Sequence, residues 1–112
     1  MALARRKMRP GKKIQVGELS IDTETRRAKR GAVELRLTPT GMRLLELLLR
    51  RSPAVVSRGE MERVIWGGDL PESDALRVHL HALRTAVDGS FERKLIRNVR
   101  GAGYAVGDDD LP

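Results

Sequence analysis

Polar and small side chains gather on one face of the segment from Leu76 to Val87, and their types suit contact with nucleic-acid bases. At about 100° per residue, a helix here places an apolar stripe on one side, at Leu76, Leu80, Leu83 and Val87. The opposite side carries Asp74, Val78, His81 and Thr85, flanked by Arg77, Ala82 and Arg84. Histidine and threonine exchange hydrogen bonds with base edges, valine packs on a thymine methyl group, and flanking arginines suit phosphates. The pattern predicts a helix that enters a major groove.

An ordinary amphipathic helix with a solvated outer face has the same pattern, so the neighbouring segments matter. Pro39 to Arg51 reads as a helix capped by Thr38, with its proline in the first turn. A second helix runs from Ser57, the start of a capping-box spacing, to about Trp66. A polar loop follows, and the third helix then begins at Ser73 or Asp74 and closes at Asp88-Gly89.

Strands are expected on both sides of these helices. Apolar residues alternate between Ile14 and Thr38 with turn signals between them, which predicts a small antiparallel sheet of three or four strands. Val33, Leu35 and Leu37 belong to this alternation. At the other end, residues 94–99 and Tyr104 to Val106 predict a hairpin that turns at residues 100–103. The order sheet, three helices, hairpin defines an α+β fold.

Charge divides the chain of 112 residues, which carries a net +7. Residues 1–13 hold six cations and no acid, which predicts a basic linker or tail. The expected folded domain, residues 14–107, is neutral as far as residue 76 and carries a net +4 beyond it. Residues 108–112 form an acidic C-terminal tail. A basic last third is typical of a domain with one end facing a polyanion, although solvated surface charge gives the same balance.

Several other functions are disfavoured. The chain has no cysteine, which excludes disulfides and thiolate metal sites and fits a reducing cytoplasm. His79 and His81, the only histidines, point about 200° apart on a helix, so we expect no shared metal ion. No nucleophile with a neighbouring base is legible, so we expect neither an enzyme nor a cofactor. The most apolar stretch, Met42 to Leu49, is too short for a membrane span.

Four segments, LTPTGMRLLELL, VVSRGEMERVIW, LRVHLHALR and IRNVRGAGY, occur in this order between Ile14 and Val106. Their combination resembles the OmpR/PhoB family of response-regulator effector domains. The resemblance implies a winged helix-turn-helix, with the third helix in the major groove of double-stranded DNA and the C-terminal hairpin, the wing, along the minor groove. It also implies two copies bound head to tail on direct repeats. The loop that family members commonly use to touch RNA polymerase falls on Gly67, Gly68, Asp69, Leu70, Pro71 and Glu72.

The resemblance also assigns individual roles, which complement the helical wheel. Base-facing positions fall on Ala75, Arg77, Val78 and Ala82, and phosphate-contacting positions on His79, His81 and Arg84. In the wing, Asn98 and Tyr104 match backbone-contacting positions, and Arg100 matches the arginine of the minor groove. Thr85 is expected at the interface from the wheel alone. Family members often carry an arginine pair where this chain has His81-Ala82, so its operator preference should differ.

The family's receiver domain finds no counterpart in this sequence. Either the chain is a fragment of a longer two-component regulator that a sensor histidine kinase controls, or the regulator lacks phosphorylation control. We expect the fragment, with residues 2–13 as the rest of the linker. The isolated domain is expected to be a monomer that forms a tandem dimer on DNA. The missing arginine pair leaves one alternative, a winged-helix protein-interaction module with weak or absent DNA binding. Arg84, Arg100 and the basic last third favour DNA.

Overall fold

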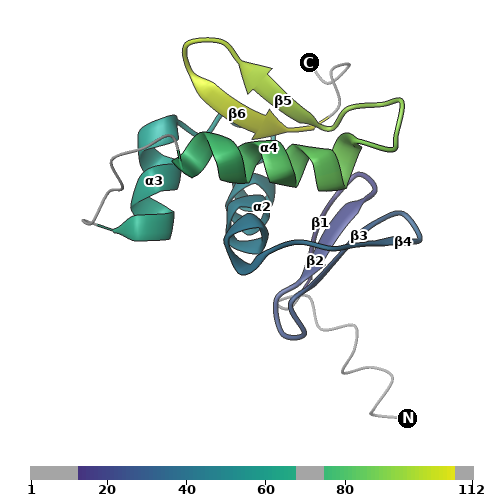
Figure 1. Cartoon of the computed structure of the whole chain (residues 1–112). Coiled ribbons are helices and arrows are strands. Elements are labelled where there is room, and N and C mark those ends of the chain that lie inside the picture. The colour runs from purple at the N-terminus through teal and green to yellow at the C-terminus, as the bar shows by residue number, and fades with distance from the viewer. Residues whose placement is uncertain (1–12, 68–74, 108–112) are drawn as a thin grey trace.

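The computed structural model describes residues 13–67 and 75–107 and begins with a four-stranded antiparallel sheet (Figure 1). The strands are β1 (Lys13–Val16), β2 (Leu19–Asp22), β3 (Arg27–Arg30) and β4 (Val33–Leu35), in the spatial order β1-β2-β3-β4. Gly17 and Gly31 take positive φ angles of 59° and 62° in two of the tight turns, where glycine avoids steric cost. The predicted sheet is confirmed, and β1 starts at Lys13, one residue before the expected start of the folded domain.

Strand β3 is the part of the sheet that apolar alternation did not reveal. Its sequence is RAKR, and its inward face carries Ala28 and Arg30, both buried. The alternation also misplaced Val33, which remains 51% exposed at the start of β4. Leu35, two residues later, is buried. Strand β4 thus buries only its last residue.

Three helices follow the sheet: α2 (Pro39–Arg51), α3 (Arg58–Trp66) and α4 (Ala75–Asp88). Thr38 caps α2, since its hydroxyl accepts the Gly41 N–H at 3.0 Å. Ser57 caps α3 by accepting the Glu60 N–H at 3.1 Å. The predicted bounds of α2 and α3 are confirmed. The Glu60 carboxylate contacts the Arg51 guanidinium, so this member of the expected capping box links α3 to the end of α2.

One apolar core joins the sheet to the helices. Helix α2 supplies its centre with the predicted leucine stripe, Leu44, Leu45, Leu48 and Leu49, each at most 3% exposed. Helix α4 packs across α2 and buries its own predicted stripe, Leu76, Leu80, Leu83 and Val87. Among the described residues, no helix combines the length and apolar character needed to cross a membrane.

The C-terminal hairpin consists of β5 (Ile96–Val99) and β6 (Gly103–Val106). It begins two residues later than predicted. The Lys94 side chain and the Leu95 N–H bind the end of α4, while the Leu95 carbonyl accepts the Gly107 N–H, just beyond β6, at 3.0 Å. The Lys94 ammonium donates to the Asp88 and Phe91 carbonyls, both at 2.9 Å. The Leu95 N–H donates to the Asp88 carboxylate at 2.9 Å.

A second attachment joins the hairpin to the segment before α3. Val56 and Tyr104 exchange both backbone hydrogen bonds, at 2.7 and 3.0 Å. The Ser52 hydroxyl also donates to the Val106 carbonyl at 2.6 Å. Gly103 makes this approach possible, because it has a φ of +145° and a Cβ there would overlap the Val56 carbonyl group. Strand β6 is thereby held against the segment that joins α2 to α3.

We predict that Gly103→Ala destabilises the domain by about 3 kcal/mol or more, since it adds backbone strain to the overlap with Val56. Gly101→Ala is the matched control in the same hairpin, with a φ of +77° and open space around its Cβ. It should cost only the left-handed conformation, about 1–2 kcal/mol. Urea unfolding followed by circular dichroism measures both, and equal losses would contradict the close approach.

The β2–β3 turn is joined to α2 by an ion pair. Arg26, which has a φ of 60°, donates from Nη1 to Glu46 Oε1 at 3.0 Å. This hydrogen bond is the main cause that lowers the pKa of Glu46, partial burial opposes it, and a bond from Arg50 adds to it. A lowered folded-state pKa stabilises the protein above the unfolded value of about 4.3, and the effect disappears as pH falls through the folded value.

We therefore predict that Glu46→Gln lowers the free energy of unfolding by about 0.5–1 kcal/mol at pH 7, the range of a surface pair. The difference from the parent should shrink as pH falls below about 4.3 and vanish in stronger acid. Glu24→Gln, in the same turn, controls for the loss of a negative charge alone. Urea unfolding at a series of pH values measures the effect, and a difference that persists in acid would refute the assignment.

Candidate nucleic-acid interface

One flank of α4 carries exposed side chains that no other described segment covers. Val78 is 64% exposed, and Arg77, His81, Ala82 and Thr85 are exposed with it. Ala75, the first residue of α4, is half-buried. A valine so open on a helix that buries four other apolar side chains contributes little to the core. The flank that the wheel assigned to base contact is thus on the surface.

The two histidines lie in different environments, as their spacing predicted. His79 is half-buried in the contact between α3 and α4, with its ring centroid 6.1 Å from that of Trp66. His81 is exposed on the open flank. Within residues 13–67 and 75–107 no cluster of side chains could hold a metal ion. His79 therefore packs between α3 and α4, and only part of its ring remains accessible.

Arg84 connects α4 to the hairpin. Its guanidinium carbon lies 5.9 Å from the centre of the Tyr104 ring, within the range of a cation–π contact. Both residues are half-buried. Their contact restricts the long arginine side chain at the border of the exposed flank, so less conformational entropy is lost when it binds an anion.

The hairpin presents its own exposed residues beside α4. Asn98 is exposed on β5 and lies opposite Tyr104 in the strand pairing. Arg100 is exposed in the turn, which projects beyond the N-terminal half of α4 in Figure 1. The two strands run along one side of the helix in this view. An exposed helix flank and a projecting basic hairpin are the two surfaces of a winged-helix domain.

A shallow hollow of about 320 Å³ lies at the C-terminal half of α4. It is lined by His81, Arg84, Thr85, Asp88, Gly89 and Lys94. Arg84 and Lys94 bring two positive charges to its wall, which suits an anionic oxygen. Sequence reasoning had not included Lys94. Its signal was a single lysine six residues after the helix end, where a lysine can donate to the carbonyl of the last helical residue, as Lys94 does to Asp88.

Sequence reasoning also missed a buried ion pair at the C-terminal end of α4, formed by Arg30 and Asp88. Arg30 and Asp88 are 2% and 4% exposed, and their side chains meet at 2.9 Å. The available signal was an arginine at the inward-facing register of β3, next to buried Ala28. A buried arginine requires a partner, and an acid at the end of a packed helix can supply one.

The loop expected to touch RNA polymerase is described only at its first residue. Gly67 ends α3, with a φ of 63° and its N–H bonded to the Arg63 carbonyl at 2.8 Å. Gly68, Asp69, Leu70, Pro71 and Glu72 lie outside the described residues. Their role stays a prediction.

The fold and this surface define a winged-helix domain with an open recognition helix, and comparisons with known proteins agree. The family described as "Transcriptional regulatory protein, C terminal" matches residues 32–106. The phosphate regulon transcriptional regulatory protein PhoB of Rhizobium meliloti is 38% identical over 94 residues, which are 83% of this chain and 41% of that protein. The chain thus spans about two fifths of that relative's length.

Solved structures show the same architecture. The DNA-binding domain of CpxR from E. coli aligns with a TM-score of 0.71 and 26% identity, over 86% of this chain and 96% of that one. The AdeR DNA-binding domain, solved in complex with an intercistronic region, aligns with a TM-score of 0.71 and 25% identity, over 85% and 98%. The chain belongs to the family of C-terminal domains of transcriptional regulatory proteins, the winged-helix effector domains of OmpR/PhoB response regulators.

Proposed function

We propose that this domain binds duplex DNA by inserting α4 into the major groove and laying the β5–β6 hairpin along the minor groove. Ala75, Arg77, Val78 and Ala82 face the bases, joined by Thr85 on the exposed flank. His79, His81, Arg84, Asn98 and Tyr104 contact the sugar-phosphate backbone, and Arg100 enters the minor groove. The result is sequence-specific control of transcription in the bacterial cytoplasm.

The observation that carries the proposal is the exposed flank of α4. Val78 is 64% exposed between exposed Arg77 and His81, while the opposite side of the helix is fully packed. A methyl-bearing side chain among hydrogen-bonding ones is the mixture that distinguishes base pairs in a major groove. The AdeR domain, of similar fold, was solved with an intercistronic region, which supports DNA as the partner.

The remaining partners follow from the family. We propose that the chain is the effector part of a longer regulator whose receiver domain answers to a sensor histidine kinase. Two effector domains bind direct repeats as a tandem dimer, and the segment 67–72 contacts RNA polymerase. These roles rest on the relatives and on the chain's share of their length. The exposed α4 flank supports only the proposed DNA contact and not these further partners.

A salt titration with short duplexes tests DNA binding. Each phosphate that the protein neutralises contributes a slope of about −0.9 to log K against log salt. We expect a slope of roughly −3 or steeper, equivalent to three or more phosphate contacts. Fluorescence anisotropy with a labelled duplex measures it. A flat dependence, with weak binding throughout, would contradict the proposal and favour a protein-interaction module.

Two substitutions separate base contacts from phosphate contacts. Arg84→Ala should weaken binding to all sequences and reduce the salt slope by about 1. Val78→Ala should change the preference at one base step, with a cost of about 1 kcal/mol on the preferred duplex. Val33→Ala is a matched control, since this valine is 51% exposed on β4 and belongs to neither α4 nor the hairpin. Selection from a random duplex pool measures preference, and parent-like behaviour of both variants would refute the α4 assignment.

A further inference from the structure

Arg30 lies on β3, outside α4 and the hairpin, and its guanidinium donates hydrogen bonds from Nε, Nη1 and Nη2. Its Nε donates to Glu18 at 2.8 Å, and its Nη1 donates to the Val87 carbonyl and the Asp88 carboxylate, both at 2.9 Å. Its Nη2 donates to the Arg93 carbonyl. The Phe91 ring lies 3.9 Å from the guanidinium carbon. A single side chain of the N-terminal sheet thus holds the end of α4 and the segment that follows it.

Asp88 completes the connection to the hairpin. Besides Arg30, its carboxylate accepts the Leu95 N–H at 2.9 Å and the Ile96 N–H at 3.0 Å. Ile96 is the first residue of β5. The last residue of α4 therefore binds the first residue of the wing directly. Three donors converge on one buried carboxylate, and together their hydrogen bonds fix the orientation of the Asp88 side chain.

Two other attachments of the wing are made to a different segment of the chain. The Val56–Tyr104 bridge and the Ser52–Val106 bond join β6 to the segment before α3. They do not bind α4. The Asp88 carboxylate bonds the end of α4 directly to the start of β5, whereas Arg84 of α4 contacts Tyr104 on β6. A buried ion pair is seldom better for stability than an apolar one, and its directed bonds favour a role in geometry.

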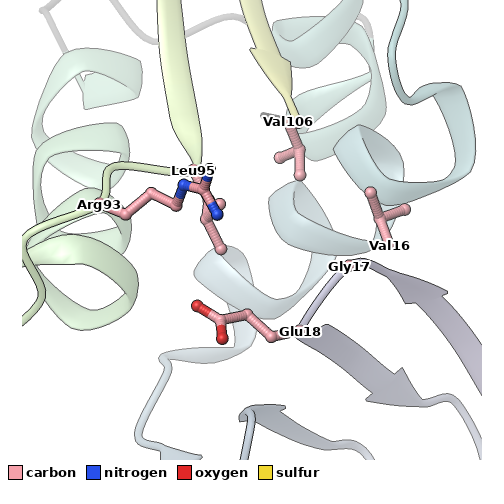
Figure 2. Close-up of a pocket in the computed structure, with 7 residues that line it drawn as sticks. Val16, Gly17, Glu18, Arg93, Leu95 and Val106 are labelled. Atoms are coloured by element: carbon pink, nitrogen blue, oxygen red, sulfur yellow. The ribbon is translucent and has the colours of Figure 1, made fainter. Parts of the chain in front are cut away.

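Figure 2 shows a cavity lined by Glu18, which is a partner of Arg30, together with Arg93 and Leu95. The cavity has a volume of about 340 Å³, and Glu18 lies in the β1–β2 turn. Glu18 is the half-exposed partner of Arg30, whereas Arg93 and Leu95 contribute backbone groups to the pair. The turn between β1 and β2 is thereby bonded to the base of the wing through Arg30.

We infer that Arg30 and Asp88 are positioning residues for DNA binding: together they fix the wing relative to α4, so that both grooves are contacted at once. This inference rests on the proposed function. Neither residue touches DNA. Their effect is transmitted through Arg100, because a wing held at a different angle carries its turn out of the minor groove. Loss of the pair should therefore remove the contribution of Arg100 and leave that of Arg77 on α4 unchanged.

A double-mutant cycle tests this with the domain and its selected duplex. Asp88→Asn keeps the shape of the side chain but turns an amide N–H toward one of the three donors. Arg30→Lys keeps the charge and cannot reach the same set of acceptors. Each is combined with Arg100→Ala and, separately, with Arg77→Ala. Glu46→Gln, which breaks an ion pair remote from the wing, is the matched control.

In the parent, Arg100→Ala should weaken binding about tenfold, the equivalent of about 1.4 kcal/mol. In the Asp88→Asn or Arg30→Lys background it should weaken binding less than about twofold, while Arg77→Ala keeps its full effect. The Glu46→Gln background should leave both effects intact. A general loss of stability would reduce both contributions together, so the selective loss distinguishes positioning from folding.

The outcomes separate the two proposals. If the parent shows no salt-dependent duplex binding, or Arg100→Ala has no effect on it, the proposed function fails and this inference fails with it. If the parent binds and Arg100→Ala costs its tenfold in every background, the inference alone is overturned. If neither pair variant retains a cooperative unfolding transition at 10 °C or below, the pair serves folding only, and the positioning role is overturned.

Discussion

A buried carboxylate must be satisfied by donors, and in this domain that requirement determines how three parts of the chain meet. Asp88 receives the Arg30 guanidinium from the sheet and two backbone N–H groups from the start of the hairpin. If one of these parts moves relative to the others, a buried charge or a buried donor loses its partner. Such a loss costs several kcal/mol for a buried pair. The orientation of the wing relative to the recognition helix is thus fixed inside the molecule.

The two sides of α4 have different roles in the domain. Its packed side ends in Val87 and Asp88 and belongs to the core, whereas its open side carries Val78 and His81. Arg84 lies between them, half-buried on Tyr104. Because the side chains of the open side are exposed, substitutions there should cost little stability.

The elements with strong local signals were predictable from the sequence. Thr38 and Ser57 cap their helices as expected, and the leucines of α2 and α4 are buried because their spacing leaves them one common face. Strand β3 was not, because RAKR has neither apolar alternation nor β-branched residues. The long-range contacts were also hidden: the partnership of Arg30 with Asp88 spans 58 residues, and the Val56–Tyr104 bridge depends on a glycine whose φ no spacing reveals. Local pattern predicts elements, whereas buried polar partners emerge only when the elements are packed.

The most direct test of the DNA-binding surface is the mapping of backbone amide chemical shifts while a selected duplex is added to the isotopically labelled domain. The account predicts that the largest changes fall on the exposed side of α4 and on the hairpin from Asn98 to Tyr104, with the β1–β4 sheet hardly affected. Changes concentrated on the sheet or on the outer side of α3, with α4 and the hairpin unaffected, would contradict it.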